Sequence, residues 1–222
     1  MVLVRWTAKL LSYVFHPLLM LTVMLVLLML INPYLFGVGS LEGGMGLVVR
    51  VFLFTYFIPA FAVLLMALLE MIQSVEMHDK SERIGPFLIT GILYLWLYIN
   101  FRNNPEIPTV YNMLMLGVLI GLYLSFFLNL FNKISLHAVG MGGLLGMVVI
   151  TASFFSYGGM TFHLSSTSVV QISMVTVISL VILLAGMVGS ARLLLGHHLP
   201  KEVYGGYLVG FMSQIIAWRI YF

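Results

Sequence analysis

Long runs of apolar residues without a formal charge dominate this sequence. The first extends from Leu10 to Ile31, which exceeds the roughly 20 residues that an α-helix needs to cross the hydrocarbon core of a bilayer. Of the 222 residues, 62% are hydrophobic and 8% are charged. A water-soluble domain could not bury that much apolar surface. The chain is therefore predicted to be an integral membrane protein.

Further apolar segments follow, separated by short stretches rich in Pro, Gly and Asn that end helices. Spans are predicted near 10–36, 46–74, 86–101, 110–131, 137–157, 168–190 and 202–221, and the third is short. The expected fold class is an all-α polytopic membrane helical bundle of about six to seven transmembrane helices. We expect a single membrane-embedded domain over residues 1–222.

Charge and cysteine content exclude several classes of function. Ten basic and seven acidic residues are scattered along the chain, which is too few and too dispersed for a nucleic-acid partner. The absence of cysteine excludes disulfides, thiolate metal ligands and a cysteine nucleophile.

Ionisable residues concentrate in three connections between spans, at 76–86, 132–137 and 192–202. Because successive spans alternate in direction, all three connections are predicted to lie on the same side of the membrane. Ionisable groups at membrane depth are costly unless they are paired or hydrated, so their convergence suggests a functional site. The alternative is a set of solvated loops that carry the positive charges typical of one membrane side.

The third connection, "SARLLLGHHLPKEVYGG", contains the most specific pattern. Pro200 suits the first turn of a helix, which places His198 and Lys201 near free backbone N–H groups that favour an anion. Glu202 follows His198 by four residues, close enough for its carboxylate to hold the imidazole in one tautomer. His198 is therefore a candidate nucleophile.

The other two connections carry basic and hydroxyl side chains. Lys80 and Arg83 are three residues apart and would share one helix face. Ser135 and His137 stand two residues apart at the start of the fifth span. Taken alone, neither pair distinguishes a phosphate site from an ordinary loop.

In order, these segments resemble the type 2 phosphatidic acid phosphatase (PAP2) family, most strongly over residues 76–210. The matching stretches are "KSERIGP" at 80–86, "ISLH" at 134–137 and "ARLLLGHHLPKE" at 191–202. The first-motif lysine stands three residues before Arg83 where the family has seven. Ile134 and Leu136 replace the family's Pro and Gly, Ala191 replaces Ser, and Glu202 replaces Asp.

The resemblance implies a metal-independent hydrolase of lipid phosphates or lipid pyrophosphates, without a cofactor, in the inner (cytoplasmic) membrane of a bacterium. His198 would attack phosphorus while Glu202 holds it, and His137 would protonate the leaving oxygen and then activate water. The phosphate ligands implied by the resemblance are Lys80, Arg83, Ser135 and Arg192. The partners would be the lipid substrate and the bilayer. A lipid or anion transporter and a catalytically inactive member of the family remain alternatives.

Two further histidines have no predicted catalytic role. His16 precedes Pro17 on the same side as the candidate site and is expected at the membrane interface. His163 is expected in a loop on the opposite side.

Overall fold

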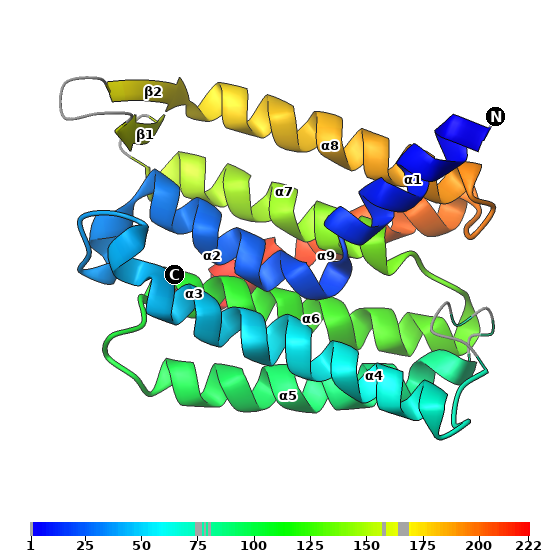
Figure 1. The fold of residues 1–222 in the computed structure, drawn as a ribbon. Helices are drawn as coiled ribbons and strands as arrows, with labels where there is room; N and C mark the ends of the chain where they lie inside the picture. The colour runs from blue at the N-terminus through cyan, green and yellow to red at the C-terminus, as the bar shows by residue number, and fades with distance from the viewer. Residues whose placement is uncertain (1, 74–76, 78, 80, 157–158, 164–168) are drawn as a thin grey trace.

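The computed structural model describes residues 2–73, 77, 79, 81–156, 159–163 and 169–222. Its long helices run side by side and form one bundle (Figure 1), which confirms the all-α polytopic fold. The helices are α1 Val2–Val14, η1 Pro17–Leu19, α2 Met20–Ile31, η2 Pro33–Phe36, η3 Glu42–Gly44, α3 Met45–Phe52, η4 Leu53–Phe57, α4 Ile58–Leu68, η5 Ser81–Arg83, α5 Ile84–Arg102, α6 Thr109–Phe131, α7 Leu136–Phe154, α8 Met174–Leu194 and α9 Pro200–Tyr221. The strands are β1 Gly159–His163 and β2 Val169–Ser173.

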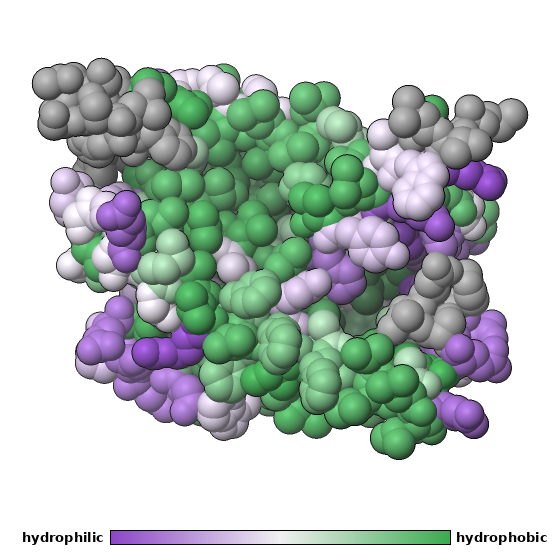
Figure 2. All heavy atoms as spheres, in the orientation of Figure 1, coloured by the Kyte–Doolittle hydropathy of each residue, from purple (hydrophilic) through white to green (hydrophobic). Residues whose placement is uncertain are grey.

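Six segments of the described chain are long and apolar enough to cross a membrane. They are Val4–Ile31, Glu42–Leu68, Ser81–Arg102, Thr109–Phe131, Leu136–Phe154 and Met174–Leu194. The visible face of the bundle is largely hydrophobic between its two ends, and hydrophilic residues gather toward those ends (Figure 2). This distribution suits a bundle surrounded by lipid.

The first span is broken, although the sequence predicted a continuous helix there. The chain leaves the α-helical path between α1 and α2, where the ring of Pro17 prevents regular helical hydrogen bonding and disfavours helical backbone in the residue before it. His16 has extended backbone, and its Nδ1 accepts a hydrogen bond from the Leu18 N–H at 3.3 Å. As a result, α1 lies against α8 while α2 enters the core.

A second break lies in the next span, where η4 is a π-helical turn between α3 and α4. The buried Tyr94 of α5 donates a hydrogen bond to the Thr55 carbonyl in this turn at 2.8 Å, and its hydroxyl lies 3.3 Å from the carbonyl of Leu18. One tyrosine side chain therefore contacts both interruptions, which places two weakened helical regions at the same depth of the bundle.

An antiparallel hairpin replaces the predicted start of the sixth span. Strand β1 pairs with β2 in the register Gly159 to Ser173, so α8 begins at Met174 and not near 168. The Val169–Ser173 stretch contains adjacent β-branched residues and pairs with β1, whereas apolar content alone could not distinguish this strand from a helix.

Helix α9 lies behind α6 and α7 in Figure 1 and packs closely against both. The helices approach at glycines. A Cβ atom on Gly210 would collide with the carbonyl oxygen of Val139 in α7. Small residues of this kind let two membrane helices come into backbone contact.

We predict that Gly210→Ala lowers the free energy of unfolding by about 1–3 kcal/mol, because the added methyl forces α7 and α9 apart. Gly205→Ala on the same helix is the matched control, since a Cβ there meets no atom within 4 Å. Thermal unfolding in detergent micelles measures both variants. Equal changes in the two would contradict the close α7–α9 contact.

Candidate active site

The three polar connections meet at one end of the bundle, on the right in Figure 1, and the α1–α2 break lies inward from them. Arg83 Nη1 donates a hydrogen bond to the carbonyl of Ile134 at 3.3 Å, which joins the first connection to the second. The backbone N–H of Ser135 donates to the carbonyl of Glu202 at 3.3 Å, which joins the second to the third. The predicted convergence on one side is confirmed.

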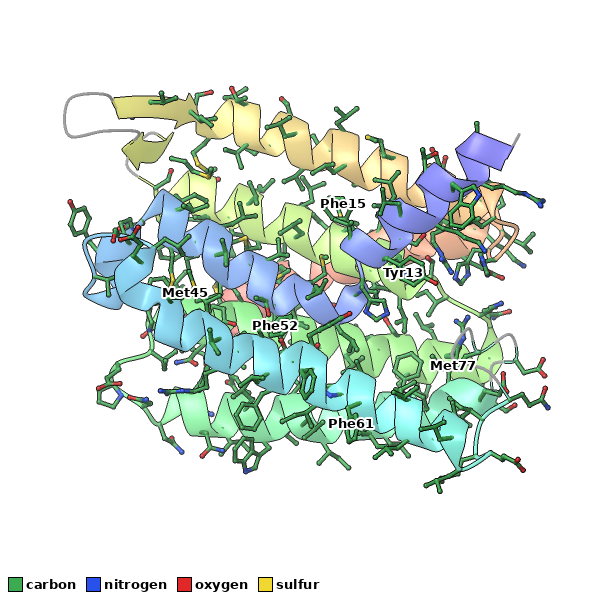
Figure 3. All side chains as sticks on the ribbon, in the orientation of Figure 1. Tyr13, Phe15, Met45, Phe52, Phe61 and Met77 are labelled. Carbon is green, nitrogen blue, oxygen red and sulfur yellow. The ribbon has the colours of Figure 1, made fainter. Side chains whose placement is uncertain are left out.

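A cavity of about 390 Å³ opens among these segments. Its polar wall comprises Lys9, Ser12, His16, Arg83, His137, Arg192, His197 and His198. Tyr13 and Met77 also line it and lie at the same end of the bundle (Figure 3). Figure 2 shows a hollow with hydrophilic surface around it, between the positions of α1 and α4. The cavity therefore opens toward the side of the bundle.

His198 and Glu202 form the pair that their spacing predicted. His198 Nδ1 lies 2.8 Å from Glu202 Oε2, and the side chain of His198 is almost completely buried. The same carboxylate oxygen accepts the backbone N–H of Leu199 at 3.3 Å, at the N-terminus of α9. Because a carboxylate accepts hydrogen bonds, Nδ1 carries the proton and Nε2 keeps its lone pair. The anion-favouring end of α9 is thus partly occupied by the protein's own carboxylate.

The surroundings keep His198 neutral. Burial lowers its pKa from 6.5 to about 4, and the positive charges of Arg192 and Arg83 act in the same direction, against the hydrogen bond to Glu202. A histidine with a lowered pKa is deprotonated at Nε2 across neutral pH, and it gains a proton only as the pH falls toward that value. A neutral imidazole is the form that can act as a nucleophile.

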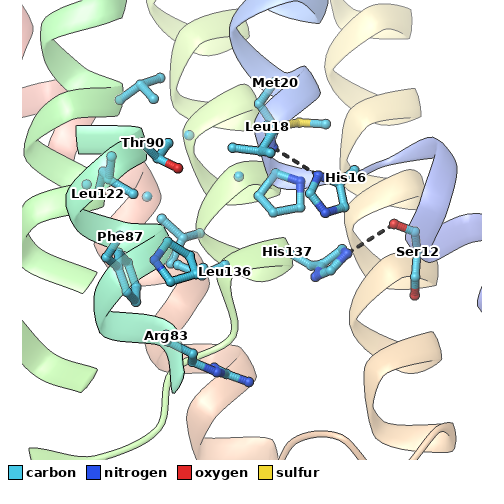
Figure 4. Close-up of a pocket in the computed structure, with 18 of the residues that line it drawn as sticks. Ser12, His16, Leu18, Met20, Arg83, Phe87, Thr90, Leu122, Leu136 and His137 are labelled. Carbon is cyan, nitrogen blue, oxygen red and sulfur yellow. Dashed lines mark hydrogen bonds between the residues drawn. The ribbon is translucent and has the colours of Figure 1, made fainter. Parts of the chain in front are cut away.

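His137 is held in the first turn of α7. Its Nε2 lies 3.0 Å from the carbonyl oxygen of Ser12, which accepts and cannot donate, so Nε2 carries a proton (Figure 4). The other ring nitrogen, Nδ1, is therefore the atom whose proton can be exchanged.

Carbonyl and hydroxyl oxygens hold the two arginine side chains so that both line the cavity. Arg83, 9% exposed, donates from Nε to the carbonyl of Met77 at 3.2 Å and from Nη1 to Ile134. Arg192 Nη1 donates to Ser12 Oγ at 3.3 Å. Ser12 thus links α8 to α7, since its carbonyl also accepts from His137.

Sequence reasoning missed His16 as a cavity residue. It was expected at the membrane interface, but it lines the cavity with its ring 5.7 Å from that of His137 and nearly perpendicular to it. Figure 4 shows both rings and Arg83 around the same space. The available signal was the His16–Pro17 pair inside an otherwise apolar span, which marks a break where a polar side chain can turn inward.

The structure does not place the predicted phosphate ligand Ser135 in the cavity. Ser135 is fully buried, does not line the cavity, and its Oγ has no hydrogen-bond partner among the described residues. Lys80 lies outside the described residues. His197 is half-buried and lines the cavity.

Within the described part of the chain, no three His, Asp or Glu side chains are grouped in a way that could hold a metal ion. The positive charge at the cavity is carried by Arg83 of η5, Arg192 of α8 and Lys9 of α1.

We predict that Arg192→Gln raises the pKa of His198, because it removes a nearby positive charge that disfavours the imidazolium. The imidazole resonances of His198, assigned by comparison with His198→Ala, report the pKa in a titration by nuclear magnetic resonance. Arg102→Gln, at the C-terminal end of α5, is the control and should leave it unchanged. An unchanged pKa in Arg192→Gln would contradict the proximity of the two side chains.

Comparison with known proteins gives no relative from which a role could be transferred to these residues. No family model, no curated protein and no solved structure matches this chain.

Proposed function

We propose that this protein is a membrane phosphatase that hydrolyses a lipid phosphate or lipid pyrophosphate through a phosphohistidine intermediate. The observation that carries the proposal is the His198–Glu202 pair beside a cavity walled by Arg83 and Arg192. A neutral imidazole oriented by a carboxylate and surrounded by fixed positive charges suits attack on an anionic phosphorus centre. The motif order that resembles the PAP2 family supports the same chemistry.

Arg83 and Arg192 bind the phosphate. Guanidinium groups present several N–H donors in a plane that matches phosphate oxygens, and they stay charged at every relevant pH. Phosphoryl transfer mainly requires positioning and stabilisation of charge on the equatorial oxygens. Lys80, from the sequence resemblance, is proposed to add a third positive charge. His16, with its Nδ1 occupied by Leu18, offers its Nε2–H as a neutral donor.

In the first step the Nε2 lone pair of His198 forms a bond to phosphorus as the bond from phosphorus to the leaving oxygen breaks. In the substrate complex, where the negative charge of the phosphate favours the imidazolium, His137 transfers its Nδ1 proton to that oxygen while its Nε2–H remains hydrogen-bonded to the Ser12 carbonyl. Glu202 stabilises the positive charge that develops on His198. In the second step His137 takes a proton from water, which attacks phosphorus and releases inorganic phosphate from His198.

The side opening of the cavity fits a substrate that arrives from the bilayer. A lipid phosphate can move laterally until its headgroup meets the arginines while its hydrocarbon remains in an apolar environment. Tyr13, 71% exposed on α1, lies at this opening and can contact the lipid headgroup region.

The proposal is tested by incubating the purified protein with a panel of lipid phosphates and measuring the inorganic phosphate released. We expect release in the presence of a chelator, and inhibition by vanadate, which mimics the trigonal-bipyramidal transition state. Arg192→Ala should abolish release and Arg102→Ala should not. Activity that is lost with a chelator and restored by Mg²⁺ would refute the mechanism, and binding without phosphate release would favour a transporter.

We predict that His198→Ala lowers turnover by several orders of magnitude, because it removes the covalent catalyst. His197→Ala is the matched control and should retain substantial activity, since Glu202 orients the ring of His198. Phosphate release is measured together with acid-labile, base-stable labelling from a radioactive lipid phosphate. Label that survives in His198→Ala but disappears in His197→Ala would reverse the assignment.

A further inference from the structure

The cavity continues past the histidines and arginines into the middle of the bundle. Along α7 its wall runs from His137 to Gly143, about 9 Å at the rise of an α-helix. We call this inner part the chamber and define it by Met20, Met24, Val118, Leu122, Gly143 and Gln214, which all line the cavity. Apart from Gln214, these residues are apolar or lack a side chain. The chamber therefore differs in chemistry from the polar end that precedes it.

Gly143 lines the chamber at a position where close packing does not require a glycine. A Cβ atom there would lie 3.5 Å from Met24 Cε and 3.8 Å from Gln214 Nε2, which are ordinary contact distances. Gly210, which also lines the cavity, instead permits backbone contact with Val139. Protein interiors are normally filled to the density of organic crystals, and empty apolar space loses dispersion contacts. A larger residue at position 143 would reduce this space.

Gln214 ends the apolar wall. Its side chain is fully buried, and its Nε2 donates to the carbonyl of Leu114 at 3.3 Å. Its Oε1 has no hydrogen-bond partner among the residues that the structure describes. A buried polar amide is an unfavourable neighbour for hydrocarbon. The apolar space therefore ends at Gln214, and a bound hydrocarbon chain would have to end there.

We propose that the chamber binds the hydrocarbon chain next to the substrate's phosphate, so that the substrate is a phosphate ester of a single-chain alcohol. This inference rests on the proposed phosphatase function. The chamber is continuous with the arginine-lined end, and its walls are apolar. The whole cavity, about 390 Å³, lies near the lower end of the range for ligand pockets. That space suits a phosphate and one chain better than a phosphate with two chains side by side.

Three variants separate this arrangement from one in which the chain leaves through the side opening. Gly143→Leu narrows the chamber, and Met24→Ala, on the facing wall, widens it. Gly186→Leu is the control because it adds the same side chain on α8 at a glycine whose Cβ would meet no atom within 4 Å and which does not line this cavity.

Phosphate release is measured with butyl, octyl, dodecyl and hexadecyl phosphate and with a diacyl phosphatidic acid. We expect wild-type kcat/KM to rise with chain length and to be lower for the diacyl lipid. Gly143→Leu should lower kcat/KM for dodecyl phosphate about 10- to 100-fold and leave butyl phosphate nearly unchanged. Met24→Ala should shift the preference toward hexadecyl phosphate. Equal losses for butyl and dodecyl phosphate in Gly143→Leu, with no shift in Met24→Ala, would overturn the proposal, as would chain-length profiles identical to that of Gly186→Leu.

Binding of the non-hydrolysable butyl and dodecyl phosphonates, measured by calorimetry, distinguishes failure of the chamber from failure of the phosphatase function. Suppose that dodecyl phosphonate binds more tightly than butyl phosphonate, that Gly143→Leu removes this difference, and that no ester releases phosphate. This result would refute the phosphatase function and support the chamber as the site of the hydrocarbon chain. Phosphate release whose dependence on chain length is changed by neither Gly143→Leu nor Met24→Ala would support the phosphatase function and refute chain binding in the chamber.

Discussion

A bilayer provides no water to form hydrogen bonds with the backbone groups at helix ends or with the ionisable side chains beside them. In this protein these backbone groups and side chains form hydrogen bonds with one another. Arg83 binds the carbonyl of Ile134, where the chain turns into α7. His137 binds the carbonyl of Ser12 near the end of α1. The N–H of Ser135 binds the carbonyl of Glu202 in α9. Loss of any one contact would expose a polar group to an apolar environment, so the polar end of the bundle holds together as a unit.

Glu202 has both a structural role and a role in the proposed chemistry. Its carboxylate caps the N-terminus of α9 through Leu199 and orients His198 through the same oxygen. A negative charge at this helix end is stabilised by the helix dipole. The arginines oppose protonation of His198. In the proposed mechanism the same charges would also bind the anionic substrate.

The sequence predicted the helical bundle, the shared side of the three connections and the His198–Glu202 pair, because apolar length and helical spacing are local properties. Other features depend on contacts between distant segments. Ser135 is buried by its neighbours, and His16 faces the cavity because α1 and α2 separate at Pro17. Strand β2 and the π-helical turn contacted by Tyr94 lie in apolar stretches whose sequences fit a regular helix equally well. The chamber arises only when α2, α6, α7 and α9 are assembled.

The packing of α9 against α6 and α7 has a consequence for how the protein is made. This helix falls outside the segments that are apolar enough to span a membrane on composition alone, yet it packs between α6 and α7 with Gly210 against the backbone of Val139. During translation it leaves the ribosome after both of these partners. Its retention in the bilayer therefore relies on a groove that earlier helices have already formed. Glu202 belongs to α9 and His198 directly precedes it. The His198–Glu202 pair therefore cannot take its place in the bundle until that late step of insertion is complete.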